Sequence, residues 1–290
     1  MFYLLARYRA KIVIFTAMQS PIITVIISTY DQPQWLQKVL LGYEHQSING
    51  FEVLIADDGS SEETKNVIRD FSRVVKYPIK HIWQEDLGFR KTVILNKAIT
   101  VASADYLLFT DGDCIPRNDF IETHLRLRKP GWFLSGGYFK LPKDISEGIT
   151  QEDIKTQNCF NVNWLKRHGL KSSFKLNKLT SRGFKESFLN FITPTKATWD
   201  GMNVSGWKKD VLLVNGFDER MQYGGEDREI GERLFNLGIR AKQIRYSAIC
   251  LHLYHERGYV QPEMITKNKA IRKVTKRDKV IRTPFGIEKD

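Results

Sequence analysis

Residues 106–114 read Tyr-Leu-Leu-Phe-Thr-Asp-Gly-Asp-Cys, and this stretch decides how the rest of the chain is interpreted. Residues 106–109 are mostly apolar and do not alternate with polar residues, which predicts a strand covered on both faces of a sheet. Asp111 and Asp113 follow at the carboxyl end of that strand, where open α/β sheets bind their ligands. Two carboxylates flanking a Gly can hold one divalent cation, although an exposed acidic turn has the same pattern.

The same pattern, an apolar strand that ends in polar residues, occurs three times before residue 106. Short connections and alternating strands and helices predict a parallel, doubly wound sheet of the α/β class. The predicted strands are 22–27, 51–56 and 79–83, and the predicted helices are 33–40, 62–71 and 92–101. The polar clusters at 28–31, 57–60, 86–90 and 111–113 then meet along one edge. We interpret their convergence as a nucleotide-phosphate site with a metal ion.

Composition narrows the function classes. The chain has 290 residues, is 42% hydrophobic and has a formal net charge of +12, which predicts a globular protein with an acidic partner. Three widely separated Cys fit a reducing compartment without a disulfide framework. No Gly-x-Gly-x-x-Gly or Gly-Lys-Ser/Thr loop follows the first strand, which argues against dinucleotide enzymes and P-loop NTPases. No stretch approaches the roughly 20 apolar residues that span a bilayer.

The second half of the sequence is less regular. Residues 140–200 are polar without a clear period, which predicts a long excursion or lid. Glu226 and Asp227 follow two glycines at the predicted start of a helix that Gly238 closes. A carboxylate at this position can act as a general base on a hydroxyl, and a simple helix cap is the alternative.

Two histidines near residue 250 are candidate metal ligands. His252 and His255 would face opposite sides of an extended segment but share a face on a turn or helix. One of them together with Asp113 would make a mixed oxygen and nitrogen site suited to Mn²⁺. A hydrogen-bonded structural role is the alternative for each histidine.

Both ends of the chain are basic. Residues 267–282 are dense in Lys and Arg and offer little to bury, and residues 1–20 interleave aromatic, apolar and basic residues. Such charges favour an anionic leaflet. We therefore predict peripheral attachment through residues 266–290 to the cytoplasmic face of the cell membrane, with a solvated tail as the alternative.

In combination and in order, these motifs resemble glycosyltransferase family 2 with the GT-A fold, which implies a Rossmann-like three-layer sandwich with a mostly parallel central sheet. The resemblance is carried by residues 24–30 (TVIISTY), 56–60 (ADDGS), 88–90 (GFR) with 95–98 (LNKA), and 110–113 (TDGD).

A second block resembles the carboxyl-terminal region of galactosyltransferases and of bacterial chondroitin-type polymerases. It consists of residues 215–219 (NGFDE) and 224–227 (GGED). The whole resemblance runs from residue 22 to residue 257 and leaves 140–200 unmatched.

The resemblance implies an inverting transfer of a sugar from a nucleotide diphosphate, usually UDP. Carried over by position, Thr29 and Asp58 would hold the uridine, and Asp31 is counted with them. Arg90 would lie by the uracil or the diphosphate. Asp111 would contact the ribose or the metal.

The resemblance also implies a metal site and a base. Asp113 would bind the Mn²⁺ or Mg²⁺ that bridges the diphosphate, and His255 would complete that site, with His252 a weaker candidate. Asp227 would be the base, and Glu226 would hold the acceptor.

These inferences divide the chain into four segments and assign one function. Residues 1–20 are an N-terminal extension, 21–130 the nucleotide-sugar-binding half, 131–262 the acceptor-binding and catalytic half with a galactosyltransferase-like region at about 200–257, and 263–290 a basic tail.

The expected function is transfer of a hexose or N-acetylhexosamine from a UDP-sugar to a glycan hydroxyl in cell-surface polysaccharide or lipopolysaccharide synthesis. The alternatives are a sugar-phosphate nucleotidyltransferase and a non-enzymatic basic nucleic-acid-binding protein. Acids clustered at strand ends would repel a polyanion, which argues against the latter.

Overall fold

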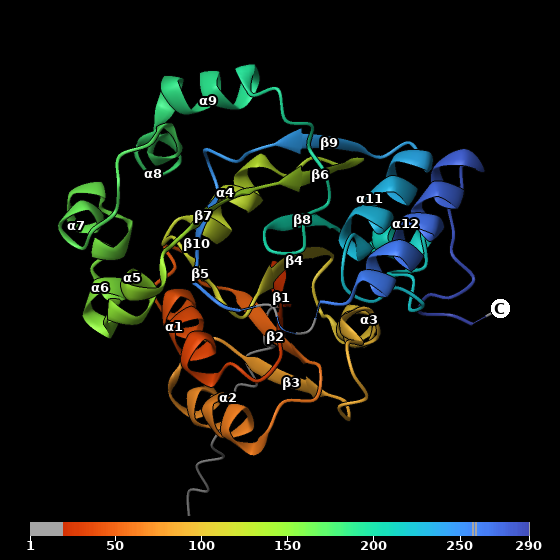
Figure 1. The fold of residues 1–290 in the computed structure, drawn as a ribbon, viewed down its shortest axis with the longest axis horizontal. Coiled ribbons are helices and arrows are strands. Elements are labelled where there is room, and N and C mark those ends of the chain that lie inside the picture. The colour runs from red at the N-terminus through yellow and green to blue at the C-terminus, as the bar shows by residue number, and fades with distance from the viewer. Residues whose placement is uncertain (1–19, 257, 259, 290) are drawn as a thin grey trace, which may run out of the picture.

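The structure is a computed structural model that describes residues 20–256, 258 and 260–289, so the predicted extension at 1–20 lies almost wholly outside the described residues. Within them, the main sheet has the strand order β3-β2-β1-β4-β8-β6-β9 (Figure 1). Strands β3, β2, β1 and β4 are parallel, β8 pairs antiparallel with β4 and β6, and β9 is parallel to β6. Their bounds are β1 Ile23–Thr29, β2 Phe51–Asp57, β3 Ile79–Trp83, β4 Tyr106–Asp111, β6 Trp132–Ser135, β8 Val204–Trp207 and β9 Arg240–Gln243.

Helices cover both faces of this sheet, so the mostly parallel three-layer α/β fold predicted from the sequence is confirmed. Successive side chains of a strand point to opposite faces. Val25 and Ile27 of β1 accordingly join one apolar cluster, and Ile26 joins the other. The first cluster includes side chains of α1 Pro33–Glu44, α2 Glu62–Val74 and α4 Phe120–Leu127, and the second those of α3 Lys91–Val101, α10 Lys208–Leu213 and α11 Glu226–Asn236.

A smaller sheet joins the two halves of the chain. Its order is β5-β10-β7, with bounds β5 Cys114–Pro116, β10 Ile249–His252 and β7 Gly137–Lys140. Strand β10 runs antiparallel to β5, and the register places His252 opposite Cys114. This pairing brings the end of β10 beside Asp113, which immediately precedes β5.

The predicted excursion at 140–200 is a chain of short helices at the edge of the molecule (Figure 1). Ile145, Ile154, Leu165 and Leu179 are buried against the cluster on the α1 side. Helices this short leave too few residues for an apolar period to be recognised in the sequence. They are α5 Lys143–Gly148, α6 Gln151–Lys155, α7 Val162–Arg167, α8 Asn177–Thr180 and α9 Gly183–Ile192, with 3₁₀ turns at Asn158–Phe160 and Phe174–Leu176.

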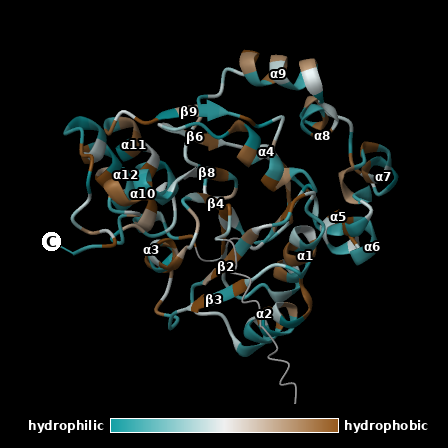
Figure 2. Ribbon diagram, turned by 180° about the vertical axis from the view of Figure 1, so that it is seen from behind, coloured by the Kyte–Doolittle hydropathy of each residue, from teal (hydrophilic) through white to brown (hydrophobic). Residues whose placement is uncertain are grey.

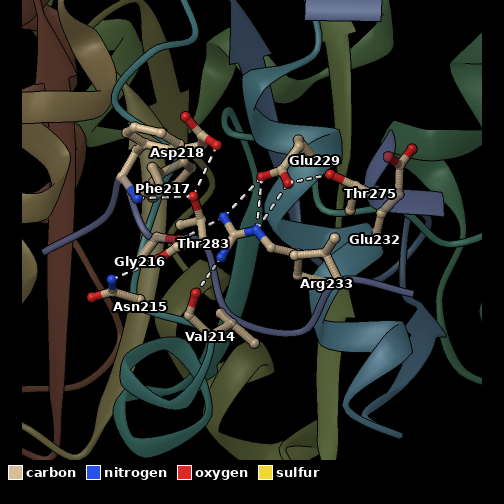
Figure 3. Close-up of polar contacts among 12 residues, drawn as sticks. Val214, Asn215, Gly216, Phe217, Asp218, Glu229, Glu232, Arg233, Thr275 and Thr283 are labelled. Atoms are coloured by element: carbon tan, nitrogen blue, oxygen red, sulfur yellow. Dashed lines mark hydrogen bonds and ion pairs between the residues drawn. The ribbon is translucent and has the colours of Figure 1, made fainter. Parts of the chain in front are cut away.

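Residues 267–282 bury few side chains, as the sequence indicates, but they are not an unpacked tail. They belong mostly to α12 Pro262–Arg277, which packs against α11. Thr275 donates to Glu229 Oε1 at 2.8 Å, and the following segment is tied down by Thr283, which donates to Asp218 Oδ2 at 2.9 Å (Figure 3). The buried contacts of this segment are largely polar, and a search for apolar periodicity does not register them.

Among the described residues, none of the helices has the length and apolar character needed to cross a membrane.

Candidate active site

A cleft of about 740 Å³ opens at the carboxyl ends of the parallel strands. Side chains from all four predicted polar clusters line it, including Thr29, Asp58, Asp86 and Asp113. The convergence predicted from the sequence is therefore confirmed. The second half of the chain contributes the opposite lining, including Glu226 at the start of α11.

The carboxylate of Asp58, which directly follows β2, is held in a fixed orientation by two hydrogen bonds. Its Oδ1 accepts a hydrogen bond from Gln84 Nε2 at 2.6 Å, and its Oδ2 accepts one from the backbone N–H of Arg90 at 2.8 Å. Burial raises the pKa of Asp58, and these two hydrogen bonds oppose the rise. The carboxyl group is thus placed to accept from a ligand N–H inside the cleft.

The structure places three other predicted nucleotide-binding residues differently. Thr29 lines the cleft. Asp31 also lines it, but its Oδ1 accepts from the backbone N–H of Ser61 at 3.1 Å and from Ser61 Oγ at 2.6 Å. Arg90 is not among the described residues that line the cleft, and its part there is the backbone N–H that Asp58 accepts.

Asp111 faces a lysine that the sequence analysis did not single out. Its Oδ1 accepts from Ser28 Oγ and from Lys91 Nζ, each at 2.6 Å. Burial alone would lower the pKa of Lys91, but the carboxylates of Asp111 and Glu226 outweigh it and raise that pKa above the ordinary lysine value. Lys91 therefore keeps its positive charge near the carboxylates of Asp111 and Glu226.

Gly112 is required by close packing. A Cβ at this position would lie 2.9 Å from Thr29 Oγ1 and 3.2 Å from the carbonyl oxygen of Ser28. Any larger residue would push the acidic turn away from β1, and Asp111 and Asp113 with it.

Among the described residues, Asp113 and the two histidines form a group that could hold a metal ion. His255 Nε2 lies 3.2 Å and His252 Nε2 4.0 Å from Asp113 Oδ2. The Nδ1 atoms of the histidines lie 2.8 and 3.0 Å from the carbonyl oxygens of Leu253 and Glu256. A carbonyl can only accept, so each Nδ1 carries the proton and each Nε2 is free to ligate.

This donor set fits a transition-metal ion. One carboxylate and two imidazoles are the mixed oxygen and nitrogen ligands that suit Mn²⁺ and similar ions. Asp111, which the resemblance also offered as a ligand, lies outside this three-residue cluster because Ser28 and Lys91 hold its carboxylate. His252, the weaker candidate, lies inside it.

The two acids at the start of α11 face the cleft from the other side. Gly224 and Gly225 adopt φ values of 107° and 94°, which only glycine tolerates readily, and the chain turns there into the helix. Glu226 accepts from the backbone N–H of Gly224 at 2.8 Å, and Asp227 Oδ2 accepts from that of Gly201 at 3.1 Å.

Burial and the neighbouring charge of Asp227 raise the pKa of Glu226 to about 7. Burial, with the charges of Asp227 and Asp111, also raises the pKa of Asp200 to about 6. The cleft therefore contains carboxyl groups poised to exchange protons near neutral pH.

Sequence reasoning missed several residues of this site. Lys91 directly follows Arg90, and its place at the start of a helix beside a strand end was the available signal. Gln84 directly follows β3, and the sequence marks it only as a polar residue at the end of that strand. Asn268 donates to the carbonyl oxygens of Gln222 and Tyr223 at 2.8 and 3.2 Å and so supports the glycine turn, but nothing in the sequence marked it.

Comparison with known proteins identifies this architecture. Residues 24–130 match the family described as glycosyl transferase family 2, and residues 186–256 match the one described as N-terminal domain of galactosyltransferase. The fold is of the GT-A glycosyltransferase type, and its cleft lies at the strand ends of the matched region. Residues 24–130 are thus similar to glycosyltransferase family 2. The second match begins within 140–200, the segment that the sequence resemblance had left unmatched.

Curated relatives span most of this chain. It is 28% identical over 232 residues to validoxylamine A glucosyltransferase of Streptomyces hygroscopicus subsp. jinggangensis, covering 76% of this chain and 52% of the relative. It is 25% identical over 244 residues to chondroitin synthase of Escherichia coli, covering 77% of this chain and 33% of the relative. The chain therefore spans about half or less of the length of these relatives.

Solved structures share the fold at low identity. S. aureus TarS 1–349 in complex with UDP-GlcNAc aligns with a TM-score of 0.59 at 14% identity, covering 89% of this chain and 70% of that one. Mannosyltransferase PcManGT from Pyrobaculum calidifontis, in complex with GDP-Man and Mn²⁺, aligns with a TM-score of 0.55 at 18% identity, covering 83% and 59%.

Proposed function

We propose that this protein is an inverting, metal-dependent glycosyltransferase that moves a hexose or N-acetylhexosamine from a UDP-sugar to a hydroxyl of a glycan acceptor. The observation that carries the proposal is one cleft with a metal-ligand cluster on one side and a pair of carboxyl groups on the other. The metal-ligand cluster could neutralise the negative charge of the departing UDP, and a carboxyl group could take the proton of the acceptor hydroxyl that attacks the sugar.

The donor would occupy the side formed by the parallel strands. Asp58 offers a carboxylate to the N–H edge of uracil, with Thr29 and Asp31 nearby and Arg90 behind. Asp113, His255 and His252 would hold the divalent cation at the diphosphate. Mn²⁺ or Mg²⁺ bound there would neutralise the negative charge that develops on the departing UDP.

The acceptor would approach from the α11 side. Asp227 takes the proton from the attacking hydroxyl, while Glu226, whose pKa is about 7, holds a second acceptor hydroxyl. Attack on the anomeric carbon from the face opposite the leaving group inverts its configuration in one displacement. No carboxylate nucleophile is required, unlike in retaining glycosidases.

The wider setting is proposed on chemical grounds. The chondroitin synthase relative is consistent with an acceptor that belongs to a cell-surface polysaccharide, and lipopolysaccharide is a second candidate. Such acceptors are assembled at the cytoplasmic face of the membrane, and the formal charge of +12 suits an anionic leaflet. Contact through residues 266–290 stays a prediction from the sequence.

A screen of UDP-sugars tests the proposal. The protein is incubated with each donor, a panel of glycan acceptors and Mn²⁺, and the first product is followed by NMR. We expect UDP release that stops in chelator, and a product whose anomeric configuration is opposite to that of the donor. A product with retained configuration would refute the inverting mechanism, and transfer that proceeds in chelator would refute the metal site.

A further inference from the structure

Helix α9 turns its phenylalanine side chains away from the body of the protein. Phe184, Phe188 and Phe191 recur at helical spacing, and the exposed fractions of Phe184 and Phe191 are 87% and 88%. The rings of Phe184 and Phe188 stack with centroids 6.2 Å apart. Helices on globular proteins normally bury their apolar stripe against the core, so this orientation indicates a surface that is covered by something else.

Contacts on the inner side of α9 fix this orientation. Asn190 donates to Ser247 Oγ at 2.9 Å and accepts from the backbone N–H of Tyr246 at 3.0 Å. Leu189, next to Asn190, is buried. Rotating the helix to bury the phenylalanines would break both hydrogen bonds, and the outward aromatic face is therefore a built feature of the fold.

The stretch of sequence that contains α9 is strongly basic. Residues 166–196 contain eight Lys or Arg residues and a single acidic residue, Glu186. The basic residues are Lys166, Arg167, Lys171, Lys175, Lys178, Arg182, Lys185 and Lys196. Phe174, on the 3₁₀ turn before α8, adds another exposed aromatic ring.

The place of α9 in the fold links this surface to the cleft. It lies at the outer edge of the molecule (Figure 1), and brown apolar residues recur along it between teal ones (Figure 2). Residues 193–199 lead from α9 to Asp200, which lines the cleft. Lys178 of α8 donates at 2.9 Å to the carbonyl oxygen of Tyr138, another residue of the cleft lining.

We propose that α9 and its flanking basic residues form the surface by which this protein lies on an anionic lipid bilayer. Exposed phenylalanines beside Lys and Arg are the composition of helices that lie in the interface plane, where rings enter the acyl boundary and cations meet headgroups. A second copy of the chain would bring an equally cationic patch against the first, which Coulomb repulsion opposes. The inference rests on the proposed function in one respect: if the acceptor is carried by the membrane, binding through this surface would bring the acceptor beside the cleft.

Binding to vesicles tests this surface independently of catalysis. The full chain is sedimented with vesicles of phosphatidylcholine alone and of phosphatidylcholine mixed with phosphatidylglycerol. The test variant is Phe184→Ser with Phe191→Ser, and the control is Val74→Ser, another exposed apolar residue on the remote helix α2. Thermal unfolding confirms that the variants fold.

We expect wild type and Val74→Ser to bind the anionic vesicles and the double variant to lose at least about tenfold in affinity. Equal binding by the double variant would overturn the proposal. So would loss of self-association in that variant, measured by analytical ultracentrifugation without lipid, because the patch would then join two copies of the chain.

A second pair of variants separates this surface from the basic tail. One replaces Lys171, Lys175 and Lys185 by Gln, and the other replaces Lys267, Lys273 and Lys279, so each removes three exposed charges. We expect the first to weaken vesicle binding by more than about tenfold and the second by a few-fold at most. Equal losses, or a larger loss in the tail variant, would contradict the assignment to α9. UDP-sugar turnover with a soluble acceptor should be the same in both variants.

Discussion

At the scale of single residues, the proposed metal site depends on a precise backbone register. The antiparallel pairing of β10 with β5 places His252 beside Asp113, and the turn after β10 brings His255 to 3.2 Å from the same carboxylate. Ordinary hydrogen bonds to carbonyl groups leave both Nε2 atoms facing Asp113. The geometry therefore makes His252 as good a candidate ligand as His255.

Removing one ligand should weaken nucleotide binding only when metal is present. We expect Asp113→Asn and His255→Ala to lower the affinity for UDP in Mn²⁺ by at least about tenfold, because the cation would lose a ligand. Isothermal titration calorimetry with UDP, in Mn²⁺ and in EDTA, measures the difference. Asp86→Asn is the matched control, since Asp86 lines the same cleft outside the cluster. Unchanged Mn²⁺ dependence in Asp113→Asn would remove Asp113 from the metal site.

The raised pKa of Glu226 predicts a pH dependence of stability. Between its ordinary value of 4.5 and about 7, the folded chain keeps a proton that the unfolded chain has released, so stability falls as pH rises through this range and then levels off. The difference corresponds to roughly 3 kcal/mol. Denaturant unfolding of wild type and Glu226→Gln from about pH 5 to about pH 8 should show wild type losing that amount relative to the variant. A constant difference between the two proteins would show that Glu226 titrates normally.

At the scale of elements, a buried ion pair within α11 includes Arg233, which also connects the helix to the loop before it. Arg233 has an exposed fraction of 0% and lies 2.8 Å from Glu229 Oε2, one turn earlier. It also donates to the carbonyl oxygens of Val214 and Gly216, as Figure 3 shows. Since Thr275 of α12 donates to Glu229, the pair connects three elements that support the acid-bearing end of α11.

Breaking this pair should destabilise the whole chain. Arg233→Met leaves the Glu229 carboxylate buried without its partner, and we expect a loss of about 3–5 kcal/mol in the free energy of unfolding. The surface pair of Lys65 and Glu62, 2.6 Å apart, is the matched control, and Lys65→Met should cost at most about 1 kcal/mol. Similar losses in the two variants, measured by urea denaturation, would mean that burial adds nothing to the first pair.

At the scale of the whole molecule, the first half of the fold could be predicted because its strands follow a simple rule. Residues 22–27 and 106–109 are mostly apolar runs that end in polar residues, and parallel strands bring those ends together. The sequence alone therefore predicts that Asp58 and Asp113 lie at one edge of the sheet, and the family resemblance adds Glu226 to the same site.

The rest depends on contacts that have no local signature. The polar inner face of α12 includes Asn268 and Thr275, which apolar periodicity does not detect. Lys91 acquires its role only because Asp111 and Glu226 close around it. The aromatic residues of α9 lie in the stretch that the sequence presents as a polar excursion, and only the structure shows that they share an outward face.

The central claim, that this cleft transfers a sugar with Asp227 as the base, is tested most directly by turnover of Asp227→Asn. UDP release from the best UDP-sugar and acceptor is measured in Mn²⁺, together with the affinity for UDP. We predict turnover lower by about 10² to 10⁴, because the amide cannot take the hydroxyl proton, with UDP affinity within a few-fold of wild type. Turnover within a few-fold of wild type in a folded, UDP-binding variant would contradict the account.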